Sequence, residues 1–307
     1  MKKKRTDEID KYDNEAELTL LLDNKKRILI IEGESDICFF KILLSECKGD
    51  VLPFCIHGEH HRSDIIELFS NFKAIQNNKS VLGLIDKDTE DYDDIVYTYN
   101  NLLVTEYADL DCYLINFSGF KSFVAQILDK PNIIRFLGYI PSENILKLRK
   151  FIYNSLVPLT RFRKVNIKYK FPLGKVFPKF PPELKKVRYK KIKKILNDKM
   201  QNESKNMFDF ISAHQECHGK EMESIVSDFD SCVLKDFEFA TNGHDIISFI
   251  TCLNNLSSIH RNDLDIEELL RLTIQLNNYT EYKLTNYIYH WALNIEGEPV
   301  KEIASMQ

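Results

Sequence analysis

The chain has 307 residues, of which 44% are hydrophobic and 29% are charged. This balance allows a buried core and excludes a disordered chain, and the length suits one large domain or two modest ones. Seven scattered cysteines without a CxxC pair indicate reduced thiols. No apolar stretch reaches the roughly 18 residues of a membrane helix, and the basic start MKKKRTDEID lacks the apolar region of a signal peptide. We therefore expect a cytoplasmic protein without a membrane partner.

The net charge of -4 hides a strongly basic segment, residues 161–199, which we call the basic island. It holds 15 Lys/Arg against Glu183 and Asp198, about +13, so the rest of the chain carries about -17. Such an island indicates a polyanionic partner, and the aromatic residues among its lysines suit contacts with phosphates and bases. A solvated Lys-rich helix or a surface for an acidic protein is the alternative. The candidate nucleic-acid contacts are Lys175, Lys179, Lys185, Lys186, Arg188, Lys190, Lys191, Lys193 and Lys194.

Strand and helix patterns alternate along the first 117 residues. Apolar strand patterns lie at 27–32, 50–58, 80–88 and 102–106, and helical patterns lie at 14–25, 35–47, 62–78 and from 109 onward, with a short helix or loop at 91–101. Pro53 places the second strand near a sheet edge. This alternation predicts an α/β fold with a parallel, doubly wound, Rossmann-like sheet.

The remainder of the chain has mainly helical patterns. Residues 118–160 predict helices, 161–182 a basic loop that contains four prolines, and 183–200 a Lys-rich helix; helical patterns also lie at 242–250, 266–276 and 282–293. His244 is expected to begin a helix, with Asn242 or Gly243 at its cap. The expected domains are 1–120 with the parallel sheet, a helical region 121–240 that carries the basic island, and a C-terminal helical segment 241–307.

Acidic residues stand where two of the predicted strands end. Glu32 follows the first strand, and Asp86 and Asp88 follow the third. In an extended chain residues i and i+2 project to the same side, so Asp86 and Asp88 can point together while Lys87 points away. Because the carboxyl ends of parallel strands share one edge, where sites collect, we expect these acids to converge.

Three more acids extend this group: Asp36, and Asp109 with Asp111 after the fourth strand. Neighbouring carboxylates repel one another unless a proton or a cation lies between them, and oxygen ligands favour Mg²⁺ or Mn²⁺ over zinc. Gly33 allows a tight turn at which a phosphate can approach a helix N-terminus. The group suits metal-assisted phosphoryl transfer. An acidic loop edge, a helix cap at Asp36 and ordinary first-turn acids at Asp109 and Asp111 are the alternatives.

These motifs resemble the Toprim domain, which is shared by topoisomerases, primases, a ribosomal RNA maturase and OLD-type nucleases. The resemblance is carried by EGESD (residues 32–36) and, some fifty residues later, DKD (residues 86–88), each after a hydrophobic strand. LLVTEYADLDCYLI and NGHDIISFI are similar to segments of a small OLD-like Toprim group, which includes the effectors of the PARIS anti-phage defence systems. The chain departs from this pattern at Asp111, where a glutamate is expected.

The resemblance implies a Mg²⁺-dependent endonuclease, with Mn²⁺ as a possible substitute and Glu32, Asp86 and Asp88 as catalytic residues. The metal, held by these residues with help from Asp36, Asp109 or Asp111, stabilises charge on the scissile phosphate, and Glu32 can act as a general acid or base. It further implies a toxic effector that an ABC-type ATPase holds in trans, and that dimerises on release and cleaves host RNA, tRNA in particular.

Other functions stay open. The spacing of the motifs does not separate RNA from DNA as substrate. A catalytically silent Toprim subunit that binds nucleic acid or regulates an ATPase, and an OLD-type DNA nuclease, are the alternative hypotheses. The chain lacks the G-x-x-x-x-G-K-[ST] motif, so an ATPase that drives it belongs to another chain.

The basic island generates the first prediction. Replacing Lys190, Lys191, Lys193 and Lys194 with Ser should weaken binding to all nucleic-acid sequences alike, because phosphate contacts position a protein without reading bases. The slope of log affinity against log salt should fall by about 3 if all four lysines contact a single strand. Filter binding at several salt concentrations measures this slope, and metal affinity should stay nearly unchanged. Normal nucleic-acid binding with loss of a protein partner would instead identify a protein-docking surface.

Overall fold

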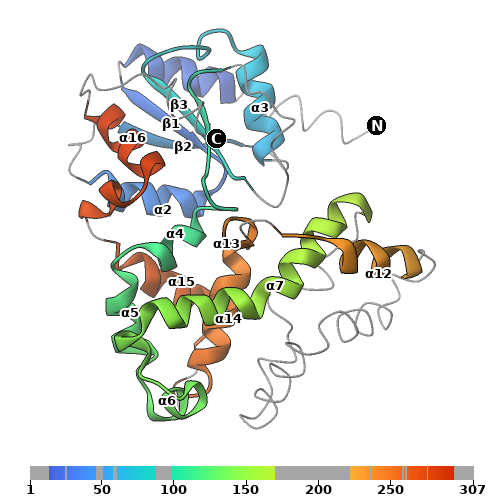
Figure 1. Ribbon diagram of the computed structural model, residues 1–307. Helices are drawn as coiled ribbons and strands as arrows, with labels where there is room; N and C mark the ends of the chain where they lie inside the picture. The colour runs from blue at the N-terminus through green and yellow to red at the C-terminus, as the bar shows by residue number, and fades with distance from the viewer. Residues whose placement is uncertain are drawn as a thin grey trace. The chain divides into compact units, whose positions relative to one another are not determined.

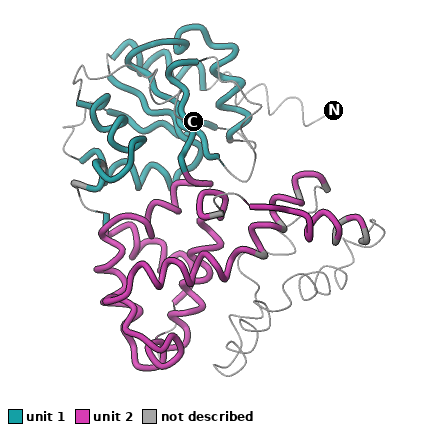
Figure 2. Tube along the Cα trace, in the orientation of Figure 1, with its two compact units in different colours: residues 1–87, 91–106, 274–307 teal, residues 88–90, 107–273 magenta. Residues whose placement is uncertain are grey.

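A computed structural model describes ten stretches of the chain: residues 14–24, 26–45, 51–57, 61–87, 99–169, 222–234, 237–257, 259, 261–274 and 276–293. These residues divide into two compact units (Figure 2). The first unit takes its described residues from 14–87, 99–106 and 274–293, and the second from 107–169 and 222–273. No helix among the described residues is long and apolar enough to cross a membrane.

The first unit contains a four-stranded, fully parallel sheet in the order β2-β1-β3-β4 (Figure 1). The strands are β1 (Arg27–Ile31), β2 (Val51–Cys55), β3 (Val81–Ile85) and β4 (Leu102–Val104). The two central strands, β1 and β3, are apolar and almost entirely buried, as strands covered on both faces must be. The expected α/β class with a parallel sheet is confirmed.

Helices cover the sheet on both faces. Leu18 of a helix at 14–23 and Ile65, Leu68 and Phe69 of α3 (His61–Asn71) share one core with Ile28 and other strand residues. The side chains of β1 that alternate with Ile28 are also buried, and they point to the opposite face of the sheet, because successive side chains of a strand point to opposite faces. Helix α2 (Glu34–Leu43) packs against β2 and buries two phenylalanines and a leucine.

Pro53 explains why β2 lies at an edge. It stands opposite Leu29 in the parallel register of β1 and β2. Proline has no N–H to donate to a neighbouring strand, so a strand that contains it is tolerated at the edge of a sheet. The predicted edge position of this strand is confirmed by the strand order.

The C-terminal part of the chain returns to the first unit. The short helix η4 (Leu276–Glu281) and α16 (Lys283–Ala292) belong to it, and Figure 1 shows α16 beside the sheet. The Arg27 guanidinium donates to the carbonyls of Trp291 and Ala292, and the Trp291 indole N–H donates to the Lys79 carbonyl at 2.9 Å. This division differs from the contiguous domains expected from the sequence (1–120, 121–240 and 241–307), because contacts across 264 residues join both ends of the first unit.

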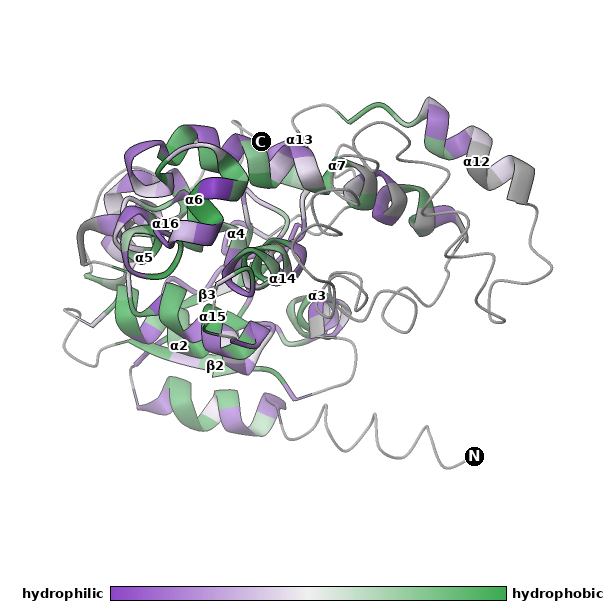
Figure 3. Ribbon diagram, turned by 90° about the horizontal axis from the view of Figure 1, so that it is seen from below, coloured by the Kyte–Doolittle hydropathy of each residue, from purple (hydrophilic) through white to green (hydrophobic). Residues whose placement is uncertain are grey.

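The described residues of the second unit are helical. Its elements are α4 (Asp111–Asn116), α5 (Phe120–Ile127), α6 (Pro131–Leu137), η2 (Pro141–Glu143), α7 (Ile145–Tyr169), α12 (Met222–Ser231), α13 (Phe237–Ala240), α14 (Gly243–Asn254) and α15 (Asp263–Arg271). Helix α14 packs against α4, α7 and α15 and buries every residue except His244, although it carries polar as well as hydrophobic side chains (Figure 3). The helices expected within 118–160, and the helix start at Asn242 and Gly243, are confirmed. The Lys-rich helix expected at 183–200 lies outside the described residues.

One expectation about the second unit is wrong. Residues 161–169, expected to begin a basic loop, form the last turns of α7. The prolines that suggested a loop begin at Pro172, beyond the end of the helix, and the basic residues before them are compatible with helical structure. Arg163 and Lys168 extend from this part of the helix to Asp245 and Asp228.

The buried side chain of Asn101 generates a stability prediction. Its amide donates to the carbonyls of Ile75 at 2.8 Å and Val81 at 3.0 Å and accepts the N–H of Asn77 at 3.1 Å, which joins β3 to the turn that precedes it. Replacing Asn101 with Ala should lower the free energy of unfolding by about 2–3 kcal/mol, because buried backbone groups lose their partners. The exposed neighbour Asn100 is the matched control, and its replacement with Ala should change little in urea denaturation.

Candidate functional site

The carboxyl edge of the sheet brings together Glu32 of the EGESD motif and Asp86 of the DKD motif. β1 and β3 are hydrogen-bonded neighbours, with Ile30 opposite Gly83, so both strands end at the same edge. Glu32 follows β1, and its Oε1 accepts the backbone N–H of Asp86 at 2.7 Å. Both residues are half-buried. A side chain from one motif thus holds the backbone at the start of the other.

Asp36 lies one turn further, at the start of α2. Its Oδ2 accepts the N–H of Gly33 at 3.0 Å, and its own N–H donates to the Gly33 carbonyl at 3.1 Å. This reciprocal pair caps the helix, which is the alternative role considered for Asp36. One carboxylate oxygen therefore serves the helix start, and a role for Asp36 as a metal ligand stays a prediction.

Thr105 is a positioning residue that the sequence interpretation did not single out. It follows β4, is almost fully buried, and its Oγ1 accepts the N–H of Lys87 at 2.8 Å. Its own N–H donates to the Ile85 carbonyl at 3.0 Å. The backbone of the acidic segment after β3 is therefore held from two sides, by Glu32 and by Thr105. The threonine of LLVTE is the feature of the sequence that could have identified this residue.

Cys55 ends β2 at the same edge. Its Sγ lies 3.5 Å from the Glu32 carbonyl oxygen. Burial, together with the negative charges of Asp36 and Glu34, raises the pKa of the Cys55 thiol. The thiol is therefore protonated at neutral pH, and a thiolate nucleophile is not part of the chemistry that this edge favours.

Two sets of predicted site residues lie outside the described residues. The first is Asp88, and the second comprises the cationic residues from Lys175 to Lys194 in the basic island. Within the described part of the island, Arg163 forms a two-point ion pair with Asp245 at 2.5 and 2.6 Å, and Lys168 pairs with Asp228 at 2.7 Å. These pairs join α7 to α14 and to α12.

Asp109 belongs to the second unit and anchors the start of α14. Its Oδ2 accepts the N–H of Gly243 at 2.7 Å, and its Oδ1 accepts the N–H of Cys112 at 3.2 Å. A Cβ at Gly243 would lie 2.2 Å from Asp109 Oδ1 and 2.6 Å from Asp111 Cβ, so this close approach requires glycine. Burial, followed by repulsion from Asp111, raises the pKa of Asp109 to about 6.

Asp111, the first residue of α4, takes part in a charged cluster. Its Oδ1 lies 3.0 Å from Arg271 Nη2, and its Oδ2 lies 3.3 Å from His244 Nδ1. The same Nη2 of Arg271 lies 2.7 Å from Glu267 Oε1. Ligand atoms of Asp111, His244 and Glu267 all lie within 4.8 Å of one another, the one such group found among the described residues.

The contacts of Arg271 favour a structural role for this cluster. A buried guanidinium already lies against both carboxylates and offsets their charge, so a cation is not needed to stabilise them. The hydrogen bonds and ion pairs of Asp109 and Asp111 are made to residues of the second unit. These contacts give both acids a structural role, and their predicted role as metal ligands stays a prediction. Nothing in the sequence pattern pointed to Glu267 or Arg271.

Comparisons with models of known protein families, with curated proteins and with solved structures found no match. The chemistry is therefore argued from the residues. Glu32, Asp36 and Asp86 place carboxylates at the end of a parallel sheet, where open α/β sheets bind ligands, but their oxygen atoms do not form a group of three within 4.8 Å of one another. This donor set fits a hard divalent cation such as Mg²⁺ or Mn²⁺ and does not fit zinc as well.

The raised pKa of Asp109 generates a prediction about pH. The folded state binds the Asp109 proton more tightly than the unfolded state, so this group's contribution to stability is full below about pH 4 and is lost as the pH rises to about 6. Asp109→Asn keeps an oxygen for the Gly243 N–H and should remove this part of the slope, which is at most about 1.4 kcal/mol per pH unit. Urea denaturation between pH 4 and 7 measures it.

The exposed Asp230 of α12 offers the control for this comparison. Asp230→Asn should leave the pH dependence as in the parent chain. An unchanged slope in Asp109→Asn would show that Asp109 is ionised with its ordinary pKa in the folded protein.

Proposed function

We propose that this chain is a Toprim-type endonuclease that requires a divalent cation and hydrolyses phosphodiester bonds. The observation that carries the proposal is the 2.7 Å hydrogen bond from the Asp86 N–H to Glu32 Oε1. It links two motifs, 54 positions apart in the chain, at the shared carboxyl edge of adjacent parallel strands. A loop edge with incidental acids does not require this contact.

The residues at the edge have separate roles in the proposed site. Glu32 and Asp86 supply oxygen ligands, and Asp88 belongs to the same set through the DKD motif. A divalent cation bound there would neutralise charge on the scissile phosphate. Thr105 and the cap formed by Gly33 and Asp36 keep the ligand-bearing backbone in place. In the proposed mechanism Glu32 also acts as a general acid or base toward a reacting oxygen.

The proposal extends to a biological role through the resemblance to OLD-like Toprim effectors. We place the protein as a toxic effector of anti-phage defence, restrained by an ABC-type ATPase in trans and active as a homodimer. RNA, and tRNA in particular, is the favoured substrate. The absence of a phosphate-binding Walker motif from the sequence supports the assignment of ATP hydrolysis to a partner chain.

The decisive experiment replaces Glu32 with Gln. Glutamine keeps a carbonyl oxygen that can accept the Asp86 N–H but removes the charge, so the fold should be retained while metal-dependent cleavage falls by at least about 100-fold. Purified protein is incubated with tRNA, other RNA and duplex DNA in Mg²⁺, in Mn²⁺ and in EDTA, and RNA ends are sequenced after induced expression.

Calorimetry with Mn²⁺ should show binding that is lost in the double variant Asp86→Asn, Asp88→Asn.

Glu34→Gln is the matched control, because Glu34 is exposed, lies two residues from Glu32, and makes no side-chain hydrogen bond among the described residues. Its cleavage should equal that of the parent chain. Unchanged toxicity and cleavage in Glu32→Gln would overturn the nuclease proposal in favour of a silent binding subunit. Preferential degradation of DNA would identify a DNA nuclease instead.

A further inference from the structure

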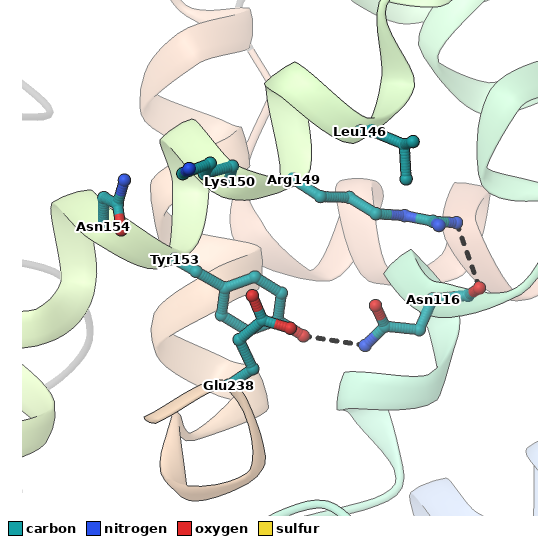
Figure 4. A pocket seen from close by; sticks show the side chains of 7 residues that line it. All are labelled: Asn116, Leu146, Arg149, Lys150, Tyr153, Asn154 and Glu238. Carbon is teal, nitrogen blue, oxygen red and sulfur yellow. Dashed lines mark hydrogen bonds between the residues drawn. The ribbon is translucent and has the colours of Figure 1, made fainter. Parts of the chain in front are cut away.

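The second unit contains a pocket, lined by polar residues and a leucine, that the proposed endonuclease function does not use. One face of α7 lines it, through residues at the helical spacing 146, 149, 150, 153 and 154, and one residue each from the end of α4 and the short helix α13 completes the lining (Figure 4). The cavity has a volume of about 410 Å³. Ligand pockets in proteins range from about 300 to 1,000 Å³, so this one suits a ligand the size of a nucleotide.

The floor of the pocket is held rigidly. Arg149 donates to the carbonyls of Ile115 at 2.7 Å and of Asn116 and Phe117 at 3.0 Å, which satisfies the C-terminal end of α4. The Asn116 amide donates to the hydroxyl of the buried Tyr153 at 2.7 Å, as Figure 4 shows. The position of the pocket wall is therefore set before any ligand binds.

The rim of the pocket differs from the floor. Lys150, Asn154 and Glu238 make no side-chain hydrogen bond or ion pair within the described part of the chain. They bring an ammonium, an amide and a carboxylate to one cavity. Leu146, 78% exposed, adds an apolar side chain at the same rim. Polar side chains that line one pocket and make no such contact within the described residues are available to bind a ligand there.

The charge of α7 indicates the kind of ligand. Over its 25 residues the helix carries no Asp or Glu and has seven Lys/Arg: Lys147, Arg149, Lys150, Arg161, Arg163, Lys164 and Lys168. Most of the chain is acidic, with a net charge of -4 overall. Arg163 and Lys168 are paired with Asp245 and Asp228, but no acidic residue of the helix itself offsets the other cations, so an anionic group is attracted to it, and Lys150 brings one of these cations to the pocket.

Glu238 makes a simple anion site a poor explanation. A carboxylate at the rim repels a free phosphate or an acidic peptide, but it accepts hydrogen bonds from N–H donors. The exocyclic amino groups of guanine, cytosine and adenine are such donors, and Asn154 can both donate to and accept from a base edge. Leu146 offers an apolar surface to the face of a base. A ligand with a phosphate near Lys150 and an amino-bearing base near Glu238 offers a partner to each polar group of the rim.

We propose that this pocket binds a single nucleotide, with its phosphate at Lys150 and an amino-bearing base at Asn154 and Glu238. The ligand is a free nucleoside monophosphate or one unstacked nucleotide of a strand, which share this chemistry. The proposal goes beyond the endonuclease function and stands without it, because binding requires neither a metal nor cleavage.

Binding of GMP, AMP, CMP and UMP to the full chain, measured by calorimetry in EDTA, tests the proposal. UMP, which lacks an exocyclic amino group, should bind most weakly. Lys150→Ala and Asn154→Ala should each weaken binding of the other three about fivefold, the effect of losing one exposed polar contact. Lys147→Ala is the matched control, because its ammonium lies over the Tyr139 ring at 4.3 Å and does not line the pocket, and it should change nothing.

Glu238→Gln separates recognition of a base from attraction of an anion. Loss of a repelling charge would tighten the binding of a simple anion, whereas a carboxylate that receives an amino group loses affinity when it is neutralised. We expect Glu238→Gln to weaken GMP binding about fivefold and Glu143→Gln, an exposed control, to leave it unchanged. Tighter binding in Glu238→Gln, or equal losses in Lys147→Ala and Lys150→Ala, would overturn the proposal.

A short RNA with 2′-O-methyl groups, which resist hydrolysis, distinguishes the two sources of the nucleotide. Tighter binding of the oligomer than of GMP, with the same loss in Lys150→Ala, supports a nucleotide within a strand; equal binding supports a free nucleotide. No binding of any of these ligands at millimolar concentration would overturn the proposal. If Glu32→Gln leaves cleavage unchanged while the chain still binds nucleotides, the nuclease proposal is refuted and the nucleotide-binding proposal stands.

Discussion

The parallel pairing of β1 with β3 is the constraint on which the candidate site depends. Because the two strands run side by side and end at one edge, the residue after β1 can reach the backbone after β3, and Glu32 does so through the 2.7 Å hydrogen bond to Asp86. β4, on the far side of β3, then supplies Thr105 to the same backbone. A different strand order would separate these residues, whatever their sequence motifs.

Acidic residues have two different uses in this protein. At the sheet edge, Glu32 and Asp86 are half-buried and need a proton, a hydrogen bond or a cation to lie close together. In the second unit, Asp109 and Asp111 are buried and bind the first N–H of α14 and the guanidinium of Arg271. A carboxylate that accepts an N–H at a helix start stabilises that helix, so Asp109 helps to explain why α14 begins at Gly243.

The two units also differ in how they bind ligands in the functions proposed for them. The sheet edge offers oxygen donors suited to a hard cation, whereas the pocket along α7 offers mixed donors and acceptors suited to a base and a phosphate. A nuclease that reads a nucleotide away from its reacting phosphate gains specificity, because the reacting phosphate itself carries no base identity.

The sequence by itself determined the parallel α/β sheet, the edge position of β2 and the helices in the described residues of the second unit. These properties follow from local patterns: buried apolar runs, a proline without an N–H, and helical spacing. It also pointed to Glu32 and Asp86 at one edge, because parallel strands of one sheet share their carboxyl ends.

Only the tertiary structure decided what depends on contacts between distant residues. Arg271 joins Asp111 to Glu267 across 160 residues of chain, the two-point ion pair of Arg163 with Asp245 lies in a helix where a loop was expected, and Trp291 brings the C-terminal helix back to β1. No local pattern encodes such partners, because an arginine or a tryptophan has the same helical and hydrophobic character whichever residue it meets. Tertiary packing determines which residues meet, and these contacts determine whether an acidic side chain stabilises the fold or is available to a ligand.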